Sequence, residues 1–167
     1  AASDVYKRQV YESTDQGENW NPYELPSLEE VVDQSPIYFI TMDMAEDGSL
    51  WAVGDRSVNE DEWNPQLMHF PKEGSAQIFD KLSLESGEQP CQVRVSDNGK
   101  VFLADYGANI YEVKEDQTVT KVLTADGRFS NLQIHNNLLA FYPDDGTGVK
   151  IYDLDQKAVS YTHLRAH

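Results

Sequence analysis

The chain is short of cysteine, of long apolar runs and of helical periodicity, and each shortage excludes a class of protein. Cys91 is the one cysteine among 167 residues, which excludes an internal disulfide framework and a CxxC metal site. Its alternating apolar surroundings favour a small core residue over a reactive thiol. No apolar stretch approaches the roughly 20 residues of a membrane-spanning helix. The remaining patterns are those of an all-β protein.

Positive charge is scarce as well. The sequence has 13 Lys and Arg against 29 Asp and Glu, a formal net charge of −16. Proteins that bind nucleic acids or anionic lipids use clustered Lys and Arg, and a chain this acidic repels both polyanions. We therefore expect no nucleic acid partner and no direct membrane contact. No motif for a metal or a cofactor is present, so we expect neither.

The two ends of the chain resemble translated sequencing-adapter DNA. Residues 1–9 back-translate to codons that contain GATGTGTATAAGAGAC, and residues 159–167 to codons that contain its reverse complement, GTCTCTTATACACATC. Two unrelated protein termini have no reason to encode an inverted repeat. We expect both tails to be foreign, as cloning scars are, and residues 10–158 to be an internal piece of a longer gene.

Short alternating runs of Val, Ile, Tyr, Phe and Trp, separated by Gly- and Asn-containing turns, predict antiparallel hairpins. The hairpins span residues 37–54, 92–105 and 132–142, the third strands 66–70, 109–114 and 149–154, and two fourth strands 77–84 and 119–124. The third strands are centred on Met68, Tyr111 and Tyr152, at intervals of 43 and 41 residues. This interval is typical of β-propeller blades.

A blade is a small sheet that buries both faces only by stacking on its neighbours. We predict an all-β fragment of a β-propeller made of four-stranded antiparallel meander blades: the last two strands of one blade, two complete blades and most of a fourth within residues 10–158. A capping-box spacing at Ser27–Glu30 predicts one or two helical turns between blades. Residues 159–164 are β-prone by accident, so they can form a foreign outer strand on the last blade.

Residues 13–20, STDQGENW, resemble the Asp-box, S-x-D-x-G-x-T-W, of the BNR-repeat β-propellers. That group includes sialidases, sortilin-type receptor ectodomains and bacterial surface proteins. The resemblance implies a structural turn with Ser13 at its start. Asp15 would accept backbone N–H groups, Gly17 would adopt a positive φ and Trp20 would pack as an anchor between blades. The match covers this octet alone, with Asn in place of the usual Thr, and implies no activity.

The loops of the predicted blades divide between two faces. Turns between second and third strands share one face with the connections between blades, and loops on a rigid scaffold are where binding residues concentrate. The loop 57–65 is the longest of these turns and has the only Trp among them, flanked by carboxylates, as in a sugar- or ligand-stacking platform. The candidate ligand-face residues are Arg56, Glu60, Asp61, Glu62 and Trp63. The alternatives are a solvated acidic loop with Trp63 folded onto its own blade, and a calcium site that lacks the usual spacing of ligands.

No catalytic residues are assigned. A sialidase-like hydrolase needs an arginine cluster, a Tyr nucleophile with a Glu partner and an Asp acid/base, whereas Arg56, Arg94 and Arg128 fall one or none per blade and outside the family's R-I-P context. We expect a non-catalytic binding or scaffold module of a bacterial extracytoplasmic or cell-surface protein, with a glycan or protein ligand. A glycosidase with its catalytic blades elsewhere and the sensor ectodomain of a membrane protein are the alternatives.

Overall fold

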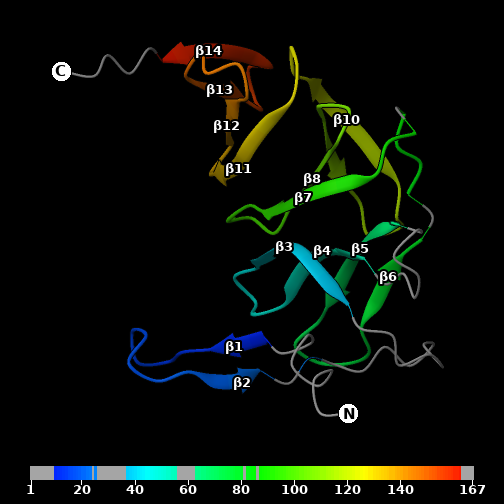
Figure 1. The fold of residues 1–167 in the computed structure, drawn as a ribbon, viewed down its shortest axis with the longest axis vertical. Coiled ribbons are helices and arrows are strands. Elements are labelled where there is room, and N and C mark those ends of the chain that lie inside the picture. The colour runs from blue at the N-terminus through cyan, green and yellow to red at the C-terminus, as the bar shows by residue number, and fades with distance from the viewer. Residues whose placement is uncertain are drawn as a thin grey trace.

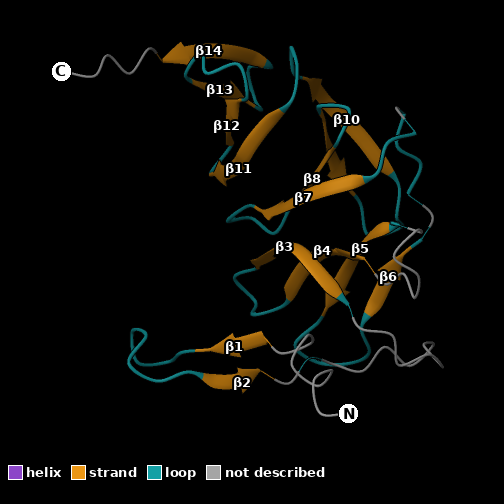
Figure 2. Cartoon of the chain, in the orientation of Figure 1, coloured by secondary structure: helices purple, strands orange, loops and turns teal. Residues whose placement is uncertain are grey.

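The computed structural model describes residues 10–23, 25, 37–55, 63–80, 82–85 and 87–162. Within these ranges the chain forms fourteen β-strands joined by turns and loops, and no helix (Figure 2). None of the described segments is therefore a helix long and apolar enough to cross a membrane. The helical turn expected at Ser27–Glu30 lies outside the described residues.

Within each sheet, consecutive strands pair antiparallel, each beside its predecessor. A two-stranded pair contains β1 (Val10–Glu12) and β2 (Asn21–Tyr23). The first sheet contains β3 (Tyr38–Met44), β4 (Leu50–Asp55), β5 (Pro65–Phe70) and β6 (Gln77–Phe79). The second sheet contains β7 (Pro90–Val95), β8 (Val101–Asp105), β9 (Asn109–Val113) and β10 (Val119–Thr124). The third sheet contains β11 (Phe129–His135), β12 (Leu138–Pro143), β13 (Val149–Asp153) and β14 (Ala158–Thr162).

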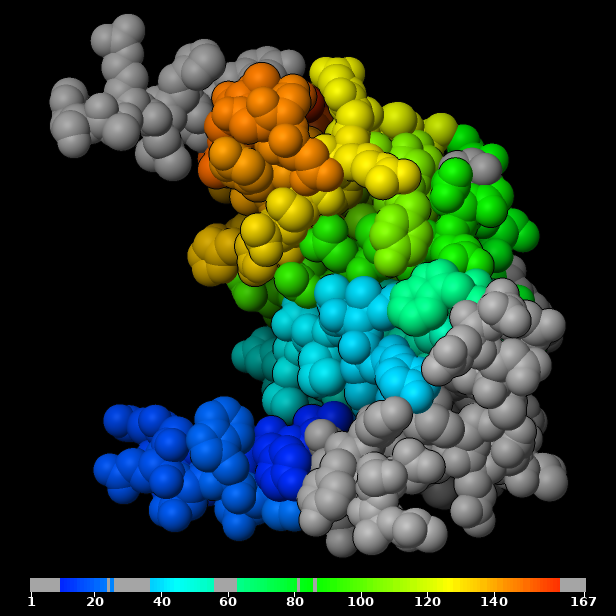
Figure 3. Space-filling model, in the orientation of Figure 1, coloured from blue at the N-terminus to red at the C-terminus, as the bar shows by residue number. Residues whose placement is uncertain are grey.

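The sheets stack in chain order, from the β1–β2 pair at the bottom of Figure 1 to the third sheet at the top. The space-filling view shows a concave left side between the projecting β1–β2 hairpin and the third sheet (Figure 3). The prediction of an all-β chain built of four-stranded antiparallel meanders is confirmed. One strand is shorter than expected: β6 ends at Phe79 rather than at residue 84. Leu82 and Leu84 leave the sheet and pack between the first and second sheets instead.

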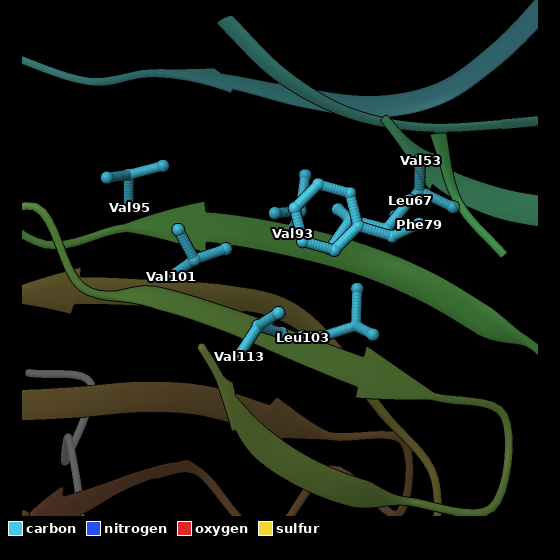
Figure 4. Close-up of a cluster of buried hydrophobic side chains, with 8 residues drawn as sticks. All are labelled: Val53, Leu67, Phe79, Val93, Val95, Val101, Leu103 and Val113. Atoms are coloured by element: carbon cyan, nitrogen blue, oxygen red, sulfur yellow. The ribbon is translucent and has the colours of Figure 1, made fainter. Parts of the chain in front are cut away.

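Because side chains alternate along a strand, the second sheet contributes to two of the three apolar cores. Along β8, Val101 and Leu103 face the first sheet, while Phe102 and Ala104 face the third. Figure 4 shows the first of these cores, with Val53 of β4 among the side chains that meet the second sheet. Since both faces of β8 are covered, all five of its residues are buried. A strand buried on both faces is what stacked blades require.

Side-chain oxygens connect the first strands of neighbouring sheets. The Thr41 hydroxyl accepts the N–H of Val93 at 3.1 Å, and the Asp43 carboxylate accepts that of Val95 at 2.8 Å. The next junction repeats the arrangement, because the Gln92 side-chain oxygen accepts the N–H of Leu132 at 2.9 Å. Backbone donors on these strands are thus satisfied by side chains from the preceding sheet.

The β1–β2 pair covers only part of the first sheet. Met42 and Met44 hold the same register positions on β3 as Val93 and Val95 on β7, directly after a bulge in each strand. The two valines are 0% and 9% exposed, whereas the two methionines are 41% and 51% exposed. A complete sheet before β3 would cover Met42 and Met44. That β1 and β2 are the last two strands of a blade stays a prediction.

The octet 13–20 forms the turn between β1 and β2. Asp15 Oδ1 accepts the N–H of Asn19 at 2.9 Å, one backbone donor where the resemblance implies several, and Gly17 has a φ of +89°. Ser13 Oγ donates to Asp15 at 2.8 Å and accepts the N–H of Gly17 at 2.8 Å. The prediction for Trp20 is wrong: its side chain is 62% exposed. The ring lies beside Gly17, where a Cβ at position 17 would stand 3.9 Å from it.

The third sheet is completed by the chain's C-terminal segment. β14 includes residues 159–162 and pairs with β13 over five residues, from Asp153 opposite Ala158 to Val149 opposite Thr162. This is the outer strand that the sequence predicts for the adapter-like tail. Its foreign origin stays a prediction. The other adapter-like tail, residues 1–9, lies outside the described residues.

Candidate functional site

Where the structure describes the loops expected to share a binding face, neighbouring loops contact one another. The N–H of Tyr106, between β8 and β9, donates to the carbonyl of Gln89 at 3.1 Å, before β7. The N–H of Asp144, between β12 and β13, donates to the carbonyl of Arg128 at 3.0 Å, before β11. The Gln89 side-chain amide also donates to the carbonyl of Trp63 at 2.7 Å. We call this the connection face.

Of the predicted ligand-face residues, Trp63 is described and the other four, Arg56, Glu60, Asp61 and Glu62, lie outside the described residues. The Trp63 side chain is 49% exposed, so its ring is not enclosed by its own blade. Beside it runs a groove of about 420 Å³ lined by residues 64–67, 79–80, 82–84 and 87–90. Trp63 thus borders a small groove on the connection face.

Two buried carboxylates hold the turns of this face, and the sequence analysis missed both. Asp55, at the end of β4 and 1% exposed, accepts the N–H of Asn64 at 3.1 Å. Asp105, at the end of β8, accepts the N–H of Asn109 at 2.9 Å and the Tyr111 hydroxyl at 3.0 Å. The sequence signal for such a turn is an Asp at the end of a sheet's second strand, followed by an Asn where the third strand begins. Each carboxylate thus holds the turn that follows its strand.

A larger groove opens on the opposite face, between the first and second sheets. Its volume is about 850 Å³. The rim consists of turn residues 45–47, 97–99 and 114–115. Trp51, Phe79, Val101 and Val113 form its apolar lining, together with the more polar His69 and Gln77. We call it the inter-sheet groove.

Aromatic side chains from neighbouring strands build one wall of the inter-sheet groove. Trp51 of β4 is paired with His69 of β5, and their rings stack with centroids 4.1 Å apart and planes inclined by 14°. Phe79 of β6 meets Trp51 edge-on at 5.2 Å. Cross-strand neighbours on one face of a sheet lie close enough for such contacts. Burial lowers the pKa of His69, and the negative charge of Asp47 only partly opposes this, so the imidazole is neutral at pH 7.

The rim of the inter-sheet groove is acidic, with carboxylates of Glu46, Asp47, Asp97 and Glu115. Hydrogen bonds from the Ser49 hydroxyl and N–H lower the pKa of Asp47, which keeps that carboxylate ionised. The rim carries a surplus of negative charge.

Two charged groups at the rim already have partners. Asp97 accepts the N–H of Asn136 at 3.1 Å and lies 3.3 Å from the imidazole of His135. The rim cation, Lys114, forms an ion pair with Glu112, a residue that does not line the groove.

The sequence patterns do not predict this groove, because they favour the connection face as the binding surface. Trp51 and His69 each stand in an alternating strand, which signals burial on one face but not which neighbour completes a groove. The groove arises from the stacking of two sheets, and local sequence patterns do not encode how far apart two stacked sheets lie.

Comparisons with known proteins support the fold. No protein-family model matches the chain, and no curated protein matches its sequence. Two solved structures, both β-propellers, are similar to it. A crystal structure of HIRA(644-1017) has a TM-score of 0.50 at 9% identity, over 83% of this chain and 40% of that one. YCF48 bound to D1 peptide has a TM-score of 0.50 at 15% identity, over 93% of this chain and 62% of that one. The chain therefore spans less than two thirds of either propeller.

Proposed function

We propose that the chain is a binding or scaffold module of a β-propeller protein and that it holds an extended protein segment in the inter-sheet groove. The observation that carries this proposal is the 850 Å³ groove with Trp51, His69 and Phe79 in its lining. Its volume falls within the roughly 300–1,000 Å³ of ligand sites, and an apolar lining with a few polar groups is typical of them. One similar propeller is described as bound to a peptide.

The architecture favours binding at low entropic cost. Both walls of the groove are sheets whose contacting faces are buried against each other. A ligand therefore meets a preformed surface, and little protein ordering opposes association. Aromatic rings supply large contact areas, and the turns at residues 45–47 and 97–99 bring backbone groups to the rim.

A second binding surface is proposed on the connection face. Trp63 and the carboxylate-rich loop before it would contact a glycan or a second protein there. We further propose that the octet 13–20 marks kinship with Asp-box propellers and that the parent protein is extracytoplasmic. The complete gene tests this kinship and location: a signal peptide or lipobox supports a surface module, a transmembrane segment a sensor, and an arginine triad with Tyr and Glu a hydrolase.

Selection from a random-peptide display library tests the groove. Binding of the selected peptides is measured by calorimetry to the unaltered chain, to His69→Ala in the groove and to Trp63→Ala on the connection face. We expect His69→Ala to weaken binding about tenfold or more, in the range of interface hot spots, and Trp63→Ala to leave it unchanged. Circular dichroism confirms that both variants fold. Failure to select any peptide, or binding that depends on Trp63 alone, would overturn the proposal.

A further inference from the structure

Negative charge outweighs positive charge around the inter-sheet groove. Lys114 is the one lysine or arginine in that lining, and its ammonium pairs with Glu112 outside it. His69 is neutral. The aliphatic stem of Lys72 approaches the turn at Gly48, so one further cation stands near the rim. The four carboxylates of the rim therefore outnumber the two nearby ammonium groups, those of Lys114 and Lys72.

Two of those carboxylates are available to a ligand. Glu46 and Glu115 are exposed, and neither forms an ion pair with any residue that the structure describes. They stand on different sheets, Glu46 in the turn after β3 and Glu115 in the turn after β9. A ligand lying in the groove would therefore meet an unpaired carboxylate on each side.

The lining suits a long aliphatic side chain with a charged end. Lys and Arg side chains bury their methylene stems against apolar surface and keep the charged group at the boundary with water. Trp51, which is half-buried, offers such a surface in the groove, and the buried side chains of Phe79 and Val113 complete its apolar lining. Trp is also the best aromatic partner for a cation. A neutral side chain would make the apolar contact but would not be attracted by the carboxylates of the rim.

We infer that the inter-sheet groove takes a cationic peptide segment, with a Lys or Arg stem against Trp51 and its charged head between Glu46 and Glu115. This inference rests on the proposed function and adds the chemical class of the ligand. The net charge of −16 also attracts cationic ligands from a distance, so association is faster at low ionic strength.

Three capped tripeptides test the inference: tri-arginine, its neutral near-isostere tri-citrulline, and tri-glutamate. Binding is followed by NMR through the Trp51 indole and His69 ring resonances. We expect tri-arginine to shift both resonances, tri-citrulline to bind about tenfold more weakly, and tri-glutamate not to bind.

Two double variants distinguish the effect of the groove carboxylates on binding from the effect of the protein's overall negative charge. Glu46→Gln with Glu115→Gln is compared with Glu18→Gln and Asp144→Asn, which remove the same charge from distant turns. We expect the groove variant to weaken tri-arginine binding about 3- to 10-fold, in line with the strength of exposed ion pairs, and the control variant to weaken it less than twofold.

The outcomes distinguish this inference from the proposed function. Equal losses in both variants, or equal binding of arginine and citrulline peptides, would overturn the cationic ligand. If selected neutral peptides still bind in a His69-dependent manner, the groove remains a binding site with a different ligand. If no peptide of any charge binds, both proposals fail.

Discussion

At the residue scale, Asp15 organises a whole turn through one carboxylate. Its two oxygens accept the N–H and the side-chain amide of Asn19, and one of them also accepts the Ser13 hydroxyl. The Asn at position 19, a departure from the Asp-box pattern, adds a bond of its own to Asp15 at 2.6 Å. Hydrogen bonds from Asn19, first from its N–H and then from its side chain, lower the pKa of Asp15.

Replacing Asp15 with Ala should lower the melting temperature at pH 7 without changing peptide binding. The folded-state pKa of Asp15 lies below the ordinary value of 3.8. Its contribution to stability is therefore complete above pH 3.8 and is lost as the pH falls through the lowered pKa. Melting curves from pH 7 to pH 2 should show the difference between the two proteins narrowing below about pH 4. Equal melting temperatures at pH 7 would contradict the assigned role, and Glu18→Gln is the exposed control.

Cys91 should be inert in the folded protein. Burial, helped by the negative charge of Asp105, raises the pKa of its thiol to about 12, and the thiolate is the reactive form. At pH 8 only about one molecule in ten thousand carries the thiolate. Iodoacetamide labelling followed by mass spectrometry should be slow in buffer and fast in denaturing urea. Rapid labelling of the folded chain would show that the side chain is more accessible than the structure indicates.

At the scale of elements, the hairpin pattern explains why the strands were predictable and the groove was not. Alternation over five or six residues, as in β8, fixes which residues face a core, and Gly48 or Gly99 fixes where the chain turns. Both are local properties. The bond from Thr41 to Val93 joins residues 52 positions apart, and the groove depends on the stacking of whole sheets. The exposure of Trp20 likewise depends on what lies beside the hairpin.

Removing the Asp105 carboxylate should destabilise the second sheet. Asp105 is 3% exposed, so Asp105→Ala removes the acceptor of the buried Asn109 N–H and breaks the hydrogen bond from the Tyr111 hydroxyl. A buried donor that loses its acceptor lowers the free energy of unfolding by about 1–3 kcal/mol. Urea unfolding of Asp105→Ala should show a loss of at least that size. Tyr111→Phe removes one bond and should cost less. If Asp105→Ala were as stable as the unaltered chain, the carboxylate would not hold the turn.

The outer strand β14 carries a separate prediction. If residues 159–167 derive from an adapter, genomic DNA that spans the locus should continue past the codon for Ala158 with a different sequence. That sequence should encode a strand with the same alternation, because β13 needs an outer partner. Finding the codons for residues 159–167 in the genome would refute the adapter origin.

At the scale of the whole molecule, the two ends of the stack expose apolar side chains that a neighbouring sheet would cover. Met42 and Met44 are exposed beside the β1–β2 pair, and Leu138 and Tyr142 on the third sheet are 43% and 42% exposed. Exposed apolar faces promote self-association, while a net charge of −16 opposes it. Light scattering should therefore show association that increases with salt, as screening removes the repulsion.

Met42→Gln with Leu138→Gln should reduce this association, whereas Tyr106→Gln, at an exposed position on the connection face, should not. A stable monomer at both low and high salt would show that these faces do not drive contact between copies.

The side-chain links between first strands also determine how the molecule would respond to a pulling force. Thr41, Asp43 and Gln92 join neighbouring sheets without a backbone ladder, whereas each sheet has ladders of its own. Under tension applied through the two ends, the junctions between sheets would break before any sheet unravels. In an optical trap, extension would therefore proceed in discrete steps, with whole sheets detaching before their strands are drawn out.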